Sequence, residues 1–157
     1  MQCAQLEAKL GSQVSFPRYQ VYDTEQDDTT VVYWSVQEQE VMPACRVTPR
    51  TTSNVSIAVQ ELAKLHCKFA VRGAGHMWWA GAANEPGGVT LDSSSFTHVT
   101  VSADRKITSA GGGSRWGAIY SKLDPMNLTV VGGRVFDVGI GGLTLGGKSS
   151  VAGCEVY

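Results

Sequence analysis

Residues 72–76 place an arginine, three small residues and a histidine in direct succession. Consecutive small residues in a turn can point several backbone N–H groups into one concavity, an arrangement that suits a pyrophosphate. Arg72 adds positive charge there or forms a surface salt bridge, and a loop histidine such as His76 is by default a surface residue. The segment is therefore a candidate anion-binding loop, and the role of its histidine depends on the surroundings.

Glycine is concentrated in the second half of the chain, where 17 of the 18 glycines lie at or beyond Gly73. They form clusters at 73–76, 111–117 and 132–147. Glycine is used where the backbone takes a positive φ or lets another group come close, so these loops are expected to be shaped around a constraint. None of the clusters fits the dinucleotide fingerprint G-x-G-x-x-G.

Residues 142–149 do fit the formal P-loop pattern G-x₄-G-K-S. A P-loop follows a buried strand and opens a helix, and little chain remains after Ser149 to form that helix. Glycines that admit a close backbone approach are the favoured interpretation. An NTPase is kept as the third hypothesis.

The sequence around His76 resembles flavoproteins of the vanillyl-alcohol-oxidase and berberine-bridge-enzyme class, particularly their fungal members. The similar segments occur in the family's order and spacing: YWS at 33–35, PAC at 43–45, FAVRGAGHMWWAGAAN at 69–84, GGVTLD at 87–92, GGGSRWG at 111–117 and VGGRVFDVGIGGL at 131–143. The resemblance covers nearly everything up to about Gly147. It implies an α+β fold, the amino-terminal part of a PCMH-type FAD-binding domain.

The resemblance also implies the site. His76 aligns with the histidine bonded covalently to the flavin 8α-methyl group, and Val135 stands where some relatives have a second, cysteinyl link, so one link is expected. The other cofactor-binding residues that the family pattern indicates are Arg72, Gly73, Ala74, Gly75, Met77, Val138, Gly139, Gly141 and Gly142. No metal ligands are expected.

An FAD-linked oxidoreductase of this class passes a hydride from a small organic substrate to the flavin, and oxygen reoxidises the flavin. The resemblance implies this activity, in secondary-metabolite biosynthesis. The family's substrate domain, which supplies the catalytic base, is missing from the chain, so the catalytic residues stay unknown and neither Tyr120 nor Asp137 is assigned. The chain is interpreted as truncated, and the alternative is a non-catalytic remnant that retains no FAD.

The elements that must position these loops follow from the hydrophobic pattern. Residues 1–40 are interpreted as a lead-in with a short helix over 6–10, and residues 41–157 as the FAD-binding domain, incomplete at its C-terminal end. Helices are predicted from a cap at Ser53 or Asn54 to about His66, and from a cap at Ser114 through Leu123. Strands are predicted at 45–49, 69–71 (buried), 89–92 and 128–131, with a hairpin at 99–107.

Composition excludes several classes of function. Lys plus Arg (13) nearly balances Asp plus Glu (14), with no basic stripe, so nucleic acid is not an expected partner. No apolar run approaches the roughly 18–20 residues of a membrane span. No leader is seen, and localisation, secreted or cytoplasmic, stays open.

The four cysteines contain no C-x-x-C pair. Two alternatives remain for them: one bridge from Cys3 to Cys45 or Cys67, or buried free thiols.

Overall fold

The computed structural model describes residues 2–16 and 33–147 and divides into two compact units. Unit 1 comprises Met1–Val71 and Met77–Asp92, and unit 2 comprises Arg72–His76 and Ser93–Tyr157. The loop predicted to bind an anion is therefore grouped with unit 2, between two stretches of unit 1. Each unit is described by itself.

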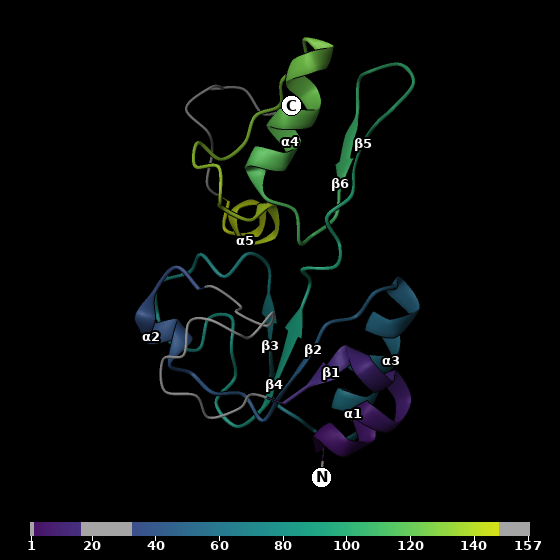
Figure 1. Cartoon of the computed structure of the whole chain (residues 1–157), viewed down its shortest axis with the longest axis vertical. Helices are drawn as coiled ribbons and strands as arrows, with labels where there is room; N and C mark the ends of the chain where they lie inside the picture. Colours follow the sequence, from purple (N-terminus) through teal and green to yellow (C-terminus); the bar gives the residue numbers. More distant parts are fainter. Residues whose placement is uncertain (1, 17–32, 148–157) are drawn as a thin grey trace. The chain divides into compact units, whose positions relative to one another are not determined.

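The sheet of unit 1 has the strand order β1-β2-β4-β3 (Figure 1). Its parallel pair, β2 and β4, sets Cys45 opposite Val89 and Val47 opposite Leu91. Every residue of β4 is buried, as expected of a central strand. The strands are β1 (Val14–Ser15), β2 (Cys45–Val47), β3 (Phe69–Arg72) and β4 (Val89–Asp92).

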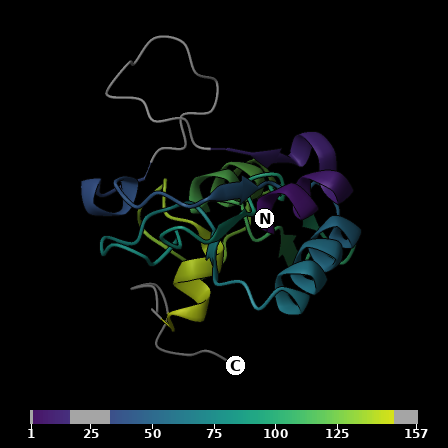
Figure 2. The same ribbon diagram turned by 90° about the horizontal axis from the view of Figure 1, so that it is seen from below.

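Helices α1 (Gln2–Leu10) and α3 (Thr52–Lys64) lie side by side and supply much of the core of unit 1 (Figure 2). Leu6 and Leu62 are fully buried in the same cluster as the strand residues Val47 and Val89. The buried residues of α1 recur at helical spacing, which is why this short segment folds as an amphipathic helix. The remaining elements of unit 1 are η1 (Gly11–Gln13) and α2 (Val36–Gln39).

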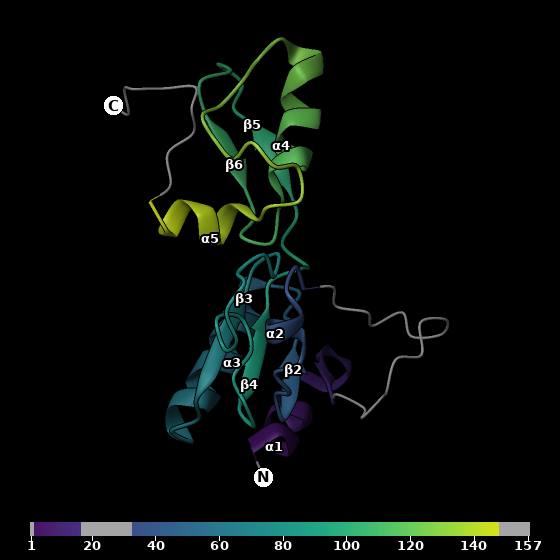
Figure 3. The same ribbon diagram turned by 90° about the vertical axis from the view of Figure 1, so that its left-hand side faces the viewer.

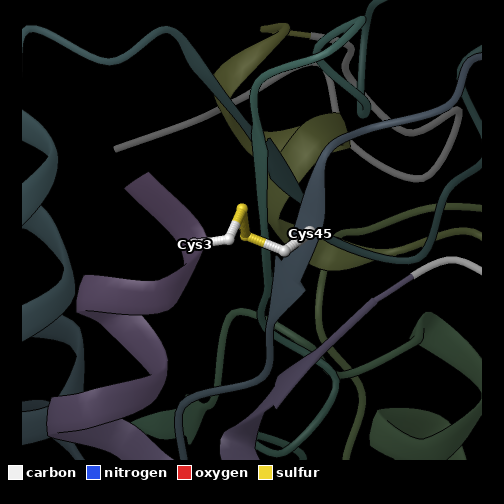
Figure 4. The surroundings of a disulfide bond; sticks show 2 residues. All are labelled: Cys3 and Cys45. Atoms are coloured by element: carbon white, nitrogen blue, oxygen red, sulfur yellow. A yellow bond between two sulfur atoms is a disulfide. The ribbon is translucent and has the colours of Figure 1, made fainter. Parts of the chain in front are cut away.

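A disulfide joins α1 to β2 through Cys3 and Cys45, with an S–S distance of 2.06 Å (Figure 4). Cys67 is a buried free thiol in the same core. The bridge confirms one of the two pairings expected from the sequence.

Unit 2 is built on a hairpin of β5 (Val99–Val101) and β6 (Thr108–Ala110), against which α4 (Trp116–Leu123) packs (Figure 3). Trp116, Ile119 and Leu123 are the buried face of α4. This spacing of three and four residues is the one that predicted the helix. A 3₁₀ turn η2 (Asp124–Met126) and a short helix α5 (Ile140–Leu145) complete the described part of the unit.

Several boundaries differ from the prediction. Thr51, rather than Ser53 or Asn54, caps α3, and its hydroxyl accepts a hydrogen bond from the Asn54 N–H at 3.2 Å. Arg115, rather than Ser114, is the N-cap of α4, and its side chain makes no capping bond. Several polar residues precede each helix, so local sequence alone does not select the cap.

Two strand predictions were wrong: one of the strands is not buried, and one of the segments is not a strand. Phe69 and Val71, which share one face of β3, are 41% and 59% exposed, so this face is not part of the buried core, and β3 lies at the end of the strand order. Residues 128–131 form no strand: Leu128 and Val130 pack on the core of unit 2 without a ladder. Alternating apolar residues are therefore satisfied by packing alone at this place.

The P-loop interpretation is wrong for the residues that the structure describes. Gly142 and Leu145 lie within α5, where a P-loop would have an open turn. Lys148 and Ser149 lie outside the described residues.

Candidate functional site

The loop 72–76 leaves β3 from a fixed starting point. Arg72 is buried, and its carbonyl accepts hydrogen bonds from the Ser93 N–H at 3.0 Å and the Ser93 hydroxyl at 2.7 Å. Gly75 is buried and has a φ of +69°, a conformation that favours glycine. Ala74, where the family usually has glycine, is not among the residues with positive φ, so the methyl group is accepted there without strain.

A second glycine segment packs directly on this loop. A Cβ built on Gly139 would lie 2.8 Å from the Ala74 Cβ and 2.9 Å from the Ala74 nitrogen. Distances this short leave no room for a side chain at 139. The loop and the residue that precedes α5 are therefore in backbone contact.

A third segment, the turn at 111–113, completes the cluster within unit 2. The Gly112 carbonyl oxygen lies 3.8 Å from a Cβ built on Gly73 and 3.1 Å from one built on Gly141. The turn is itself held tightly, because Cβ atoms on Gly111 and Gly113 would lie 2.3 and 2.0 Å from carbonyl oxygens. Glycine segments far apart in the sequence thus meet at one place.

Hydrogen bonds of the backbone tie the third segment to the second. Ile140, the first residue of α5, donates its N–H to the Ser114 carbonyl at 3.0 Å, and Trp116 donates to the Val138 carbonyl at 3.0 Å. Arg115 forms a β-bridge with Gly139. The start of α4 therefore fixes where α5 begins.

The arrangement fits a ligand with a diphosphate. Among the loop and turn hydrogen bonds of the described residues, none has the N–H of Gly73, Ala74 or Gly75 as its donor. The Ser114 side chain is 1% exposed, and within the described chain its hydroxyl has no partner. A buried hydroxyl without a partner among the described residues, close to a turn of small residues, suits a polar ligand such as a diphosphate.

The structure brings together only some of the residues predicted from the sequence. Gly73, Ala74, Gly139 and Gly141 meet as described above. His76 and Val138 are half-buried in the same unit, and Gly142 is exposed. Met77 is 40% exposed and is grouped with unit 1.

Sequence reasoning noticed the glycines at 111–113 but did not assign Gly112 or Ser114 to the site. The sequence signal that could have assigned Gly112 and Ser114 was the glycine cluster itself, since close packing requires glycine at both 111 and 113. The sequence did not show which residues the cluster contacts, because the contacts of Gly112 with 73 and 141 are long-range.

Tyr120 and Asp137 have structural partners. The Tyr120 hydroxyl donates to the Gly133 carbonyl at 2.9 Å, and burial raises the pKa of its phenol above the usual 10.0. The Asp137 carboxylate is exposed and lies 3.3 Å from the Arg115 guanidinium. Neither observation assigns a catalytic role.

Residues 2–16 and 33–147 contain no group of three His, Cys, Asp or Glu side chains arranged to hold a metal ion. Over the same part of the chain, no helix has both the length and the apolar character that a membrane crossing requires.

Comparison with known sequences identifies the class. Residues 43–157 match the FAD binding domain family. An FAD-dependent monooxygenase of Fusarium proliferatum is 44% identical over 119 residues, which are 76% of this chain and 23% of that relative. One of Cochliobolus heterostrophus is 38% identical over 142 residues, which are 89% of this chain and 27% of that relative. The chain thus spans about a quarter of the length of these curated relatives.

Solved structures show the same fold. A xylooligosaccharide oxidase from Myceliophthora thermophila superposes with a TM-score of 0.73 at 19% identity, over 92% of this chain and 30% of that one. A glucooligosaccharide oxidase from Acremonium strictum, described with a 6-S-cysteinyl, 8α-N1-histidyl FAD, gives 0.71 at 24% identity, over 92% and 29%. CrmK, a flavoenzyme of caerulomycin biosynthesis, gives 0.57 at 29% identity, over 63% and 20%.

The fold is therefore the amino-terminal part of a PCMH-type FAD-binding domain, as the sequence predicted. The chain belongs to the FAD binding domain family.

Proposed function

We propose that this chain is the FAD-binding part of an FAD-linked oxidoreductase and that His76 forms its covalent bond to the flavin 8α-methyl group. The observation that carries the proposal is the meeting of the loop 73–75, the turn at 112 and the residues 139–141, with His76 directly after that loop. The histidyl FAD of the Acremonium strictum oxidase supports the same linkage here.

The residues of the chain have distinct tasks in this function. The backbone N–H groups of Gly73, Ala74 and Gly75 bind the pyrophosphate, with Arg72 adding charge, and Met77, Val138, Gly139, Gly141 and Gly142 complete the contacts. The His76 imidazole fixes the isoalloxazine ring. Val135 makes no second link, since valine has no nucleophilic atom. The bound flavin supplies hydride acceptance from a small organic substrate and reoxidation by oxygen.

The domain arrangement and the biological setting belong to the same proposal. Residues 41–157 would form the FAD-binding domain and residues 1–40 the lead-in. The flavoenzyme of caerulomycin biosynthesis supports a role in secondary metabolism.

A second candidate is a non-catalytic remnant that retains no FAD. The observation that favours it is the coverage, since the chain spans only 23% and 27% of the two relatives described above.

Absorption of the acid-denatured chain distinguishes the two candidates. The wild-type chain, incubated with FAD and precipitated with acid, should keep its yellow colour, and His76→Ala should lose it completely. His98→Ala is the matched control, because His98 is an exposed histidine of unit 2 outside the loop. A colourless wild-type chain would contradict the covalent flavin link and favour the non-catalytic remnant.

A further inference from the structure

Glu38 is a fully buried carboxylate that serves the segment just after His76. It lies in α2 and is 0% exposed. Its Oε1 accepts a hydrogen bond from the Ala83 N–H at 2.9 Å, and its Oε2 accepts one from the Ala82 N–H at 3.1 Å. Both oxygens therefore hold consecutive backbone donors of one loop.

Asn84, the next residue, is also hydrogen-bonded to Glu38. Its side-chain amide donates to the Glu38 carbonyl at 3.1 Å. Its oxygen accepts hydrogen bonds from the Tyr33 hydroxyl at 2.7 Å and the Thr90 hydroxyl at 2.8 Å. All of these side chains are buried, so the network is shielded from water.

The segment is also held near its other end. The Ser35 hydroxyl, which caps α2 by accepting from the Glu38 N–H, donates to the Trp78 carbonyl at 2.8 Å. Residues 78 and 82–84 are thus tied to the same short helix. All of these residues belong to unit 1.

Core packing does not explain why a carboxylate is buried here. The side chains of Trp78 and Trp79 are 61% and 51% exposed, so the held segment presents its large residues to solvent. No ion pair of the described residues includes Glu38, and the cost of burying its charge is offset by backbone donors alone. The burial of Glu38 costs desolvation and is accompanied by little buried apolar surface. We infer that its role is to hold the loop in one conformation.

We propose that Glu38 is a positioning residue for the flavin-linking segment. Its carboxylate binds the backbone of Ala82 and Ala83 and, together with the bonds to Trp78 and Asn84, fixes the conformation of the chain from 78 to 84. That Glu38 affects flavin attachment, the flavin part of the inference, rests on the proposed function. That Glu38 holds the loop, the clamp part, rests on the hydrogen bonds alone.

Glu38→Gln tests the clamp, because the glutamine amide keeps the size of the side chain but offers only one acceptor oxygen. Glu61→Gln is the matched control: Glu61 is another buried carboxylate of unit 1, but it bonds to the side chains of Lys9 and Lys64. The full chain is used, and two quantities are measured: amide hydrogen exchange over 77–84, and the rate at which acid-stable flavin forms with added FAD.

In Glu38→Gln, the amide of residue 82 or 83 that loses its acceptor oxygen should exchange about 10- to 100-fold faster, as expected for the loss of a hydrogen bond to a charged group. Flavin attachment should slow in the same variant. Glu61→Gln should leave both quantities close to wild type even if it lowers the melting temperature.

Unchanged exchange in Glu38→Gln, or an equal loss of flavin attachment in both variants, would overturn the proposal. If Glu38→Gln does not fold, Tyr33→Phe removes a single bond to Asn84 and should accelerate exchange over 77–84 to a smaller degree, and no acceleration there would be equally decisive. A wild-type chain that takes up no flavin overturns the proposed function and the flavin part together, while hydrogen exchange still decides the clamp.

Discussion

Three buried or half-buried polar side chains of this protein bind backbone groups of loops. Glu38 accepts from two amides, the Ser93 hydroxyl donates to the Arg72 carbonyl, and the Tyr120 hydroxyl donates to the Gly133 carbonyl. Each one fixes a loop at which regular structure ends. At the scale of the residue, these polar side chains therefore fix loop conformations within each unit.

Tyr120→Phe should remove the bond to Gly133 and lower the free energy of unfolding by about 1 kcal/mol. It should also change the pH dependence of stability. Burial raises the pKa of the folded-state phenol, so the folded chain holds this proton more tightly than the unfolded chain. The resulting stability is present below the usual pKa of 10.0 and is lost as the pH rises through the folded-state value.

Urea unfolding from pH 8 to 11 measures this effect. The alkaline loss of stability should be smaller in Tyr120→Phe than in the wild-type chain. An identical alkaline decline in both proteins would show that Tyr120 titrates alike in the folded and unfolded chains.

At the scale of the element, close backbone contact positions α5. The helix begins where the Ile140 N–H meets the Ser114 carbonyl, one residue after the contact of Gly139 with Ala74. An element of six residues has little intrinsic stability, so contacts at its first turn decide its place.

Gly139→Ala should lower the free energy of unfolding by about 1–3 kcal/mol, because the new methyl group meets Ala74. Gly142→Ala is the control within the same segment, since no atom of the described residues outside its own helix backbone and chain neighbours lies within 4 Å of its Cβ position, and it should be neutral or stabilising in thermal unfolding without FAD. Adding Ala74→Gly to Gly139→Ala should recover part of the loss. Equal melting temperatures for the two single variants would contradict the packing.

At the scale of the whole molecule, one covalent bond closes a long stretch of chain. Cys3 and Cys45 are separated by 42 positions, and their bridge fixes α1 against the sheet of unit 1. Residues 17–32 of the chain between them lie outside the described residues, and the bridge joins the described part before them to the described part after them.

The double variant Cys3→Ser with Cys45→Ser should unfold with about 4 kcal/mol less free energy than the oxidised wild-type chain, by the loop-closure estimate for 42 residues. Urea unfolding with and without a reductant measures the difference, and the reductant should affect only the wild-type chain. Cys67→Ala, which removes the free thiol, should keep the sensitivity to reductant. A wild-type chain insensitive to reductant would contradict the bridge.

The class of cofactor and the elements beside the loop could be predicted from the sequence. The residues 69–84 are contiguous, so their pattern indicated the fold family without any tertiary information. Local periodicity also placed α3, α4, β4 and the β5–β6 hairpin close to where they lie. It did not fix the caps at Thr51 and Arg115, where neighbouring polar residues compete for one position.

Only the tertiary structure decided which distant segments are in contact. The contacts of Gly112 with 73 and 141, the choice of Cys45 rather than Cys67 as the partner of Cys3, and the clamp of Glu38 on Ala82 and Ala83 all join residues far apart along the chain. Sequence determines local conformation through short-range sterics and periodic hydrophobicity, whereas these contacts exist only once the helices and strands have packed.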